Sequence, residues 1–261
     1  MKAVRCVYPQ DWKTLNIYTL ADLHLGDPRA AREEVQRRID EVKNDPYGLC
    51  ILNGDLINMA TRNGVSDVYG EVLSPMQQII AISDLIRPIA DRVIGATTGN
   101  HEARVYKEDG VDIMRLVCRE LAIEDKYDPD GVVIFLRFGH YSHGSHAARD
   151  NRLWYTIYAT HGSGGGRKEG AKAIRLADMA TICEADIYVH AHTHLPVIMK
   201  NAFYRTDERN CCIKRAERLF VNVGATLDYG GYAERGEYKP ASMHTPVIHL
   251  DGKKKYATAT L

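Results

Sequence analysis

The sequence has no excess of charge of either sign, no long apolar run and no paired-cysteine motif. Its 261 residues contain 34 Lys and Arg and 34 Asp and Glu, so no global basic field indicates a nucleic-acid partner. A local basic patch remains open. No segment approaches the ~20 apolar residues of a membrane span. The first residues, MKAVRCVYPQDWK, lack the apolar stretch of a signal peptide, so none is expected.

The six cysteines are scattered and form no C-x-x-C pair. Only Cys211 and Cys212 are adjacent, and adjacent cysteines rarely bridge each other. We therefore expect reduced thiols and a cytoplasmic protein. There is no internal repeat, low-complexity linker or convincing boundary, so residues 1–261 are expected to form a single domain.

Apolar periodicity predicts alternating strands and helices in the first half of the chain. Strands are expected over residues 15–24, 48–55 and 92–102, and helices over residues 28–45, 74–91 and 111–122. This βαβαβ order predicts a mostly parallel, buried sheet. In the second half one helix is expected, over residues 167–184. Strands are expected there over residues 131–139, 153–162, 186–192, 195–206, 218–226 and 245–252.

Residue types that bind metals lie at the carboxyl ends of five of the predicted strands. In chain order they are Asp22 and His24, then Asp55, then Asn100 and His101, then His161, then His192 and His194. In α/β sheets, ligands gather beyond the carboxyl ends of the strands. Each short motif is weak alone, whereas all five in this order are a strong signal for a metal site.

The motifs DLH, GD, GNHE, THG and AHTH resemble, in this order, those of the calcineurin-like metallophosphoesterases. The match runs from Asp22 to His194, about two thirds of the chain. Ala191 stands where the family has glycine, and because alanine is small we expect the turn to form with a slight adjustment. The resemblance implies an α/β fold, a four-layer α/β/β/α sandwich of two mixed β-sheets flanked by helices.

The resemblance also implies two metal ions at the sheet edge. It assigns to the first metal Asp22, His24, Asp55 and His194. It assigns to the second metal Asp55, Asn100, His161 and His192. Asp55 is then the bridge, and a carboxylate between two divalent ions offsets their repulsion. Mixed nitrogen and oxygen ligation favours manganese, with Fe, Zn, Ni or Co as alternatives, over Mg or Ca.

The implied activity is hydrolysis of phosphodiester or phosphomonoester bonds by a metal-bound hydroxide, on a small or nucleotide-like substrate. His101 would protonate the leaving oxygen or stabilise the transition state. Glu102 would accept a hydrogen bond from the His101 ring or from a ligand histidine. Arg104 and Arg167 lie close to ligands in the sequence and are candidate phosphate-binding cations, although each alone is more often an ordinary surface charge.

Two other functions stay open. One is a DNA nuclease resembling the double-strand-break repair nuclease, against which the neutral charge and the lack of an added domain speak. The other is a metal-binding scaffold without catalysis, against which the intact ligand set and His101 speak. The expected partner is a phosphoester substrate, which could be a nucleotide or a nucleic acid. No membrane partner is expected. The oligomeric state is left open.

Three segments carry alternatives of their own. Residues 161–170, HGSGGGRKEG, lack the P-loop pattern. Their glycines would cradle a phosphate, let the backbone pass close to the metals, or form a mobile flap over the substrate. Residues 139–152 hold three histidines three apart, and their glycines and serines favour an exposed connection over a third metal site. Residues 200–218 mix Lys and Arg with aromatics, which fits a nucleic-acid contact, but interspersed acids favour a solvated hairpin or loop. His190 is expected to be structural or to support the ligands.

Overall fold

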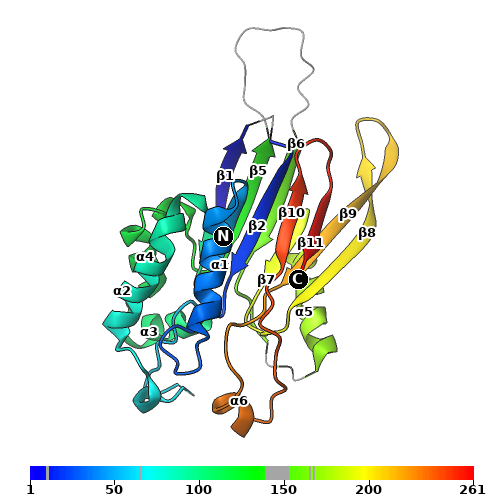
Figure 1. Ribbon diagram of the computed structural model, residues 1–261. Helices are drawn as coiled ribbons and strands as arrows, with labels where there is room; N and C mark the ends of the chain where they lie inside the picture. The colour runs from blue at the N-terminus through cyan, green and yellow to red at the C-terminus, as the bar shows by residue number, and fades with distance from the viewer. Residues whose placement is uncertain (10–11, 65, 139–152, 165, 167) are drawn as a thin grey trace.

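The computed structural model describes residues 1–261 except 10–11, 65, 139–152, 165 and 167 (Figure 1). The strands of the described part form two sheets. The five-stranded sheet has the order β11 (Ala257–Thr260), β10 (Val247–Asp251), β2 (Thr14–Leu20), β3 (Gly48–Asn53), β4 (Val93–Thr97). The six-stranded sheet has the order β1 (Lys2–Tyr8), β5 (Val132–Phe138), β6 (Leu153–Ala159), β7 (Ile187–His190), β9 (Cys212–Asn222), β8 (Val197–Asp207).

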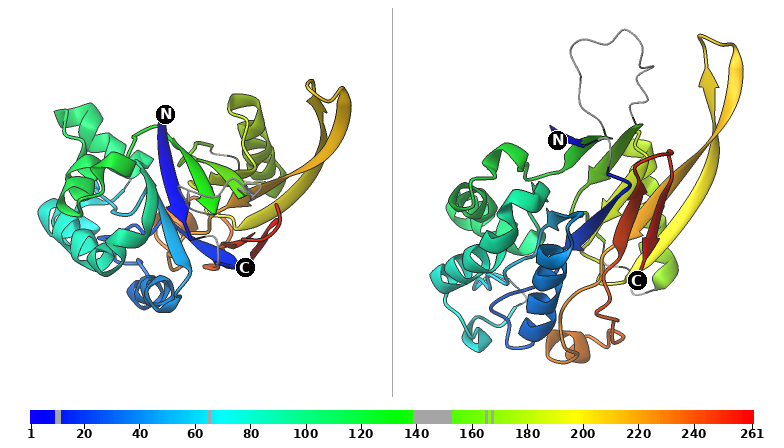
Figure 2. Two further views of the ribbon diagram at one scale, coloured as in Figure 1. Left: turned by 90° about the horizontal axis from the view of Figure 1, so that it is seen from above. Right: turned by 45° about the horizontal axis from the view of Figure 1, so that its top comes forward.

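Helices cover the outer faces of both sheets (Figures 1 and 2). The five-stranded sheet is covered by α1 (Arg32–Asn44), α2 (Pro75–Ile86), α3 (Asn100–Asp109) and α4 (Ile113–Glu120). The six-stranded sheet packs against α5 (Glu169–Ile182), and a short helix, α6 (Tyr232–Arg235), precedes β10. No helix among the described residues is long and apolar enough to cross a membrane. The predicted α/β/β/α sandwich is confirmed.

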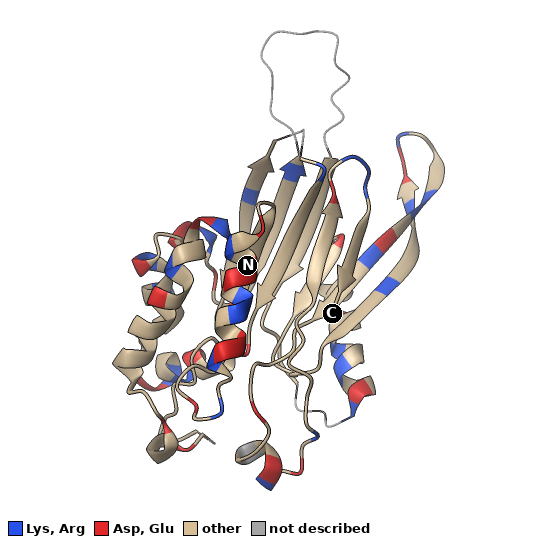
Figure 3. Ribbon diagram, viewed as in Figure 1, with Lys and Arg blue, Asp and Glu red and all other residues tan. Residues whose placement is uncertain are grey.

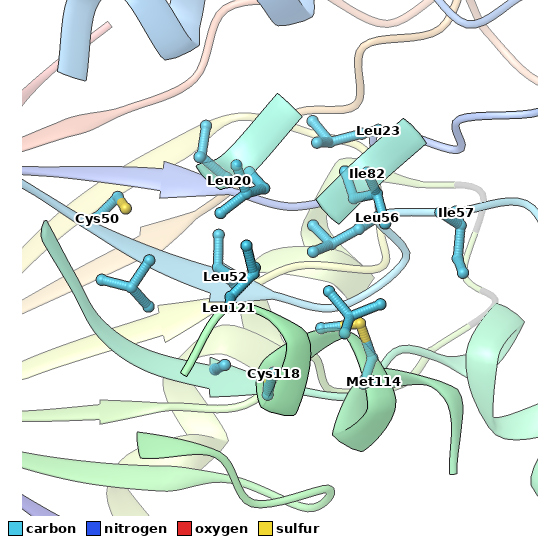
Figure 4. Packing of buried hydrophobic residues seen from close by; sticks show 14 of the residues in the cluster. Leu20, Leu23, Cys50, Leu52, Leu56, Ile57, Ile82, Met114, Cys118 and Leu121 are labelled. Atoms are coloured by element: carbon cyan, nitrogen blue, oxygen red, sulfur yellow. The ribbon is translucent and has the colours of Figure 1, made fainter. Parts of the chain in front are cut away.

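Side-chain alternation along the central strands separates the inner and outer layers of the core. In β3, Ile51 faces the other sheet, whereas Cys50 and Leu52 face the helices. Figure 4 shows the outer cluster, in which Leu52 lies among side chains from several elements, including Ile82 of α2 and Met114 of α4. Because both faces of β3 are buried, its sequence is an apolar run rather than an alternating one.

The third predicted strand, over residues 92–102, was too long. The strand β4 ends at Thr97, and the pattern missed the helix α3, which begins at Asn100. This helix begins there because the side chain of Glu102 accepts a hydrogen bond from the Gly99 N–H, 2.9 Å away. The edge strands β1 and β11 were also missed. Both form by pairing with another strand, such as β1 with β5 more than a hundred residues away.

The strands β8 and β9 form a hairpin that projects beyond the rest of the six-stranded sheet (Figure 2). They pair with each other over eleven residues each, whereas β9 pairs with β7 only through residues 219–222. Acidic and basic side chains are interspersed along it (Figure 3). The hairpin predicted for residues 200–218 is confirmed, and the nucleic-acid contact stays a prediction. Residues 139–152 lie outside the described residues.

Candidate metal centre

Six of the seven sequence-predicted ligands converge in groups whose ligand atoms lie close enough to hold a metal ion. Within each group one atom per residue lies within 4.8 Å of all the others. The groups are Asp22, His24 and His194; Asp55, His161 and His192; and His24, Asp55 and His101. Asp55 belongs to two groups and so lies between the two histidine sets, as a bridging carboxylate would.

The seventh predicted ligand, Asn100, lies at the same place. Its Oδ1 atom is 2.6 Å from His192 Nδ1 and 3.2 Å from His161 Nε2. Because Asn100 is the first residue of α3, the start of that helix delivers its side chain into the group. The structure therefore brings all seven predicted ligands together from loops that follow β2, β3, β4, β6 and β7.

Each of the two aspartates has one oxygen fixed by the backbone and one directed at histidines. Asp22 Oδ2 accepts the His192 N–H (3.0 Å), and Asp55 Oδ1 accepts the His101 N–H (2.8 Å). Asp22 Oδ1 is buried, has no hydrogen-bond partner in the described part, and lies 3.3 Å from His194 Nε2. Leaving a buried carboxylate oxygen without a partner is costly. A metal ion would satisfy it, so the residues fit a metal.

Two histidine rings are oriented by backbone carbonyls. The Nδ1 atom of His161 donates to the carbonyl of Asn53 at 2.7 Å, and that of His101 donates to the carbonyl of Asn58 at 2.7 Å. This hydrogen bond directs the Nε2 atom of each ring toward Asp55, at 3.2 Å from His161 and 3.9 Å from His101. Metal-binding histidines are commonly held by such a bond. Sequence reasoning missed Asn53 and Asn58 because they act through their main chain.

The protonation preferences of the cluster follow from burial and from the two carboxylates. Burial lowers the pKa of His24 well below its ordinary value and also lowers that of His192, which favours the neutral imidazole that binds metals. Burial would also lower the pKa of His161, but the Asp55 carboxylate beside it raises it to about 10. Burial acts to raise the pKa of Asp55, but His161, His101 and His24 together lower it well below its ordinary value. Metal binding at His161 must therefore release a proton.

Backbone strain is concentrated in the same residues. Nine non-glycine residues of the described part have positive φ, and five of them belong to this cluster: Asp22 (51°), His24 (47°), Asp55 (50°), His192 (65°) and His194 (56°). Left-handed backbone at such residues costs about 1–3 kcal/mol each and is found mainly at functional sites. Hydrogen bonds between the loops help to hold it, including Asp22 N–H to the Gly54 carbonyl (3.1 Å) and His24 N–H to the Asp55 carbonyl (3.0 Å).

Two glycines allow the ligand loops to touch. A side chain on Gly54, whose φ is +78°, would meet the Gly99 backbone at 2.4 Å. A side chain on Gly99 would meet the Asp55 backbone nitrogen at 2.2 Å. The glycines of the GD and GNHE motifs are therefore required because the loops after β3 and β4 pack backbone to backbone at Asp55.

Glu102 has a different role from the one predicted. Its carboxylate is buried and accepts backbone N–H groups instead of contacting the His101 ring: Oε2 from Asp55 (3.0 Å) and Gly99 (2.9 Å), and Oε1 from Leu56 (2.7 Å) and Ile57 (3.3 Å). Burial and the neighbouring Asp55 raise its pKa to about 7, whereas the N–H donors favour the charged form. Glu102 thus ties the loop after β3 to the start of α3.

Of the two predicted phosphate-binding cations, Arg104 and Arg167, the structure describes only Arg104. Arg104 is half-buried, and its Nη2 lies 3.0 Å from His101 Nε2 while its Nη1 donates to Ser66 Oγ at 2.9 Å. Arg104 therefore lies beside the predicted catalytic histidine. Arg167 lies outside the described residues.

His190 and Ala191 behave as expected. The His190 side chain is buried, belongs to none of the metal-ligand groups of the described part, and its Nδ1 lies 2.8 Å from Asn222 Oδ1. A side chain on Gly162 would collide with His190 at 2.0 Å, so His190 also fills the space next to Gly162.

Ala191 is buried, and its N–H donates to the His161 carbonyl at 3.1 Å, so the turn before His192 forms without glycine.

Comparison with solved structures returns, among others, a metallophosphoesterase, a predicted phosphoesterase and Vps29. A metallophosphoesterase from Sphaerobacter thermophilus is 12% identical with a TM-score of 0.43, over 94% of this chain and 86% of that one. A predicted phosphoesterase from Streptococcus pneumoniae is 15% identical with a TM-score of 0.38, over 95% and 98%. Zinc-bound Vps29 from Entamoeba histolytica is 11% identical with a TM-score of 0.35, over 94% and 97%.

Such distant likeness carries no inference about activity. No family model matches the sequence, and no curated protein matches it.

Proposed function

We propose that this protein is a phosphoesterase that requires two divalent metal ions. The observation that supports this best is the position of Asp55 between two sets of histidines, with Asp22 Oδ1 unpartnered nearby. Isolated structural histidines are not expected to share carboxylates in this way. The motif order in the sequence supports the same proposal.

The first ion would be held by Asp22, His24, Asp55 and His194, and the second by Asp55, Asn100, His161 and His192. When bound, a pair of divalent ions lowers the pKa of a water nucleophile and offsets the negative charge of a phosphoryl group. The mixed nitrogen and oxygen ligands suit manganese, iron, zinc, nickel or cobalt, with manganese proposed first.

The chain's own contribution lies in His101 and Arg104. His101 is fixed by the Asn58 carbonyl, and its Nε2 atom lies between Asp55 and the Arg104 guanidinium. The pair places positive charge and a hydrogen-bond donor where negative charge develops on the leaving oxygen. The same pair orients the phosphoryl group before reaction, since a guanidinium binds phosphate oxygens well.

The direct test is hydrolysis of p-nitrophenyl phosphate and bis-p-nitrophenyl phosphate by the full chain with Mn²⁺, Fe²⁺, Zn²⁺, Ni²⁺ or Co²⁺. We expect metal-dependent turnover of at least one ester. Absence of turnover of both esters with every metal would refute the proposal. Labelled single- and double-stranded DNA belong in the same panel, and cleavage of DNA alone would favour the nuclease. Two bound metals without any turnover would favour the scaffold.

Variants test the roles of individual residues. His101→Ala should lower kcat by about 10²- to 10⁴-fold while leaving the metal content unchanged. The matched control is His244→Ala, because His244 is an exposed histidine that belongs to none of the ligand groups of the described part. An activity of His101→Ala equal to that of His244→Ala would contradict the role of His101, although the metal site would stand.

A further inference from the structure

A cavity of about 400 Å³ lies on the outer side of Arg104. It is lined by Thr61, Asn63, Gly64, Arg104, Lys107 and Glu108, which come from the loop after β3 and from α3. No motif in the sequence points to it, because the two segments are separated by β4.

Arg104 connects this cavity to the candidate metal centre. One end of its guanidinium contacts His101 Nε2 at 3.0 Å, and the other donates to Ser66 Oγ at 2.9 Å. Gly64 lies against the same guanidinium, since a Cβ atom there would be 3.5 Å from Nη1. The cavity is therefore linked to His101 through Arg104, which lines the cavity and contacts the His101 ring.

The charges around the cavity favour an anion. Arg104 and Lys107 are three residues apart on α3 and so lie on neighbouring positions of one helix face. Lys107 is exposed and forms no hydrogen bond or ion pair with the described part of the chain. Glu108 is the one acid of the lining, and its Oε1 accepts the Thr61 hydroxyl at 2.9 Å. Two positive charges against one negative leave a local excess of one positive charge.

None of the described residues that line the cavity is aromatic. Stacking of a base or another ring on it is therefore unsupported, and recognition there depends on charge and on the polar groups of Thr61 and Asn63.

We propose that this cavity binds an anionic group on the leaving part of the substrate, so that the preferred substrate is a phosphoester whose leaving group carries a further phosphate. The inference rests on the proposed phosphoesterase function and names its substrate class. Nucleotides with more than one phosphate have this chemistry.

The test compares matched substrates that differ only in the additional phosphate. For monoester hydrolysis the pair is adenosine 5′-monophosphate and adenosine 3′,5′-bisphosphate. For diester hydrolysis it is the thymidine dinucleotide TpT and its form phosphorylated at both the 5′ and 3′ ends, so that the leaving part carries the added phosphate whichever P–O bond breaks. We expect kcat/KM to be at least about five-fold higher for the phosphorylated member of the pair that is turned over, as one added charge-assisted contact allows.

Two charge-changing variants sharpen the test. Lys107→Gln should raise KM for the phosphorylated substrate by roughly two- to five-fold, the range of an exposed charge pair, and leave kcat unchanged. Glu108→Gln should lower that KM by a similar factor, because glutamine can still accept the Thr61 hydroxyl. Lys43→Gln is the matched control, because Lys43 is exposed and lies near the end of α1. It should change the KM of neither substrate.

Equal kcat/KM for both members of the pair, or equal effects of Lys107→Gln on both, would overturn the inference and leave the phosphoesterase standing. Absence of hydrolysis of any ester would remove the proposed function and this inference together. A replacement of Arg104 is unsuitable, because it would also release His101.

Discussion

Replacing Glu102 tests whether the buried carboxylate holds the ligand loop in place. In Glu102→Ala, the N–H groups of Asp55, Leu56, Ile57 and Gly99 lose their acceptor. Each buried donor left without a partner costs about 1–3 kcal/mol. The variant also no longer has to desolvate a buried carboxylate, and this gain in stability offsets part of the cost of the unpaired N–H groups. We expect a net loss of about 3–5 kcal/mol in the free energy of unfolding.

Glu102→Gln separates hydrogen bonding from space filling, because the amide has almost the same volume as the carboxylate. Its oxygen can accept two of the four N–H groups, and its NH₂ must then face the other two donors. We expect a loss of about 2–3 kcal/mol if Glu102 acts as an acceptor. If the side chain only fills space, the loss should be close to zero.

The assay is urea unfolding followed by tryptophan fluorescence, in EDTA so that metal binding does not contribute to stability. Glu33→Gln on α1 is the matched control, since Glu33 is exposed, and should stay within about 0.5 kcal/mol of the parent. Metal affinity measured separately should fall about 10- to 100-fold in Glu102→Gln, because the position of Asp55 depends on this contact. A glutamine variant as stable as the Glu33→Gln control would refute the reasoning.

Three further predictions concern the metals and the thiols. Asp55→Asn should lower the content of both metals and His24→Ala mainly that of one; an unchanged count in Asp55→Asn by elemental analysis would contradict a bridging carboxylate. Dialysis against EDTA should abolish hydrolysis and Mn²⁺ should restore it, whereas activity that survives would argue against a metal requirement. Burial raises the pKa of the Cys118 thiol to about 12, so iodoacetamide should label exposed Cys211 and Cys212 in the native protein and Cys118 only after unfolding. Mass spectrometry that finds Cys118 labelled as fast as the exposed pair would contradict its burial.

The sequence predicted that the candidate ligands would lie together, and the reason is simple. Asp22 and Asp55 follow neighbouring parallel strands of the five-stranded sheet, whose carboxyl ends meet at one edge, and His161 follows β6 of the six-stranded sheet. Residue type, order and the position after a strand were enough to expect a cluster. The fold class was predicted from the resemblance of the five motifs to those of the calcineurin-like metallophosphoesterases. Strand limits were less accurate, as the overlong third strand shows.

Other features depend on contacts between distant segments and could not be deduced from the order of residues. The N–H donors of Glu102 lie on two loops, and Arg104 reaches Ser66, 38 residues earlier in the chain. The positive φ values at Asp22 and the other ligands are imposed by neighbouring loops, against the intrinsic preference of these residues.

The sequence by itself therefore determined which residue types gather at the sheet edge, because the chemistry of imidazole and carboxylate and the period of the strands are local properties. The tertiary structure alone decided which oxygen of Asp22 is left without a hydrogen bond, how Asp55 is held between two sets of histidines, and that a charged cavity is lined by the arginine that contacts His101. Those features result from close packing of loops that are far apart in the chain, and only the folded backbone brings them within hydrogen-bonding distance.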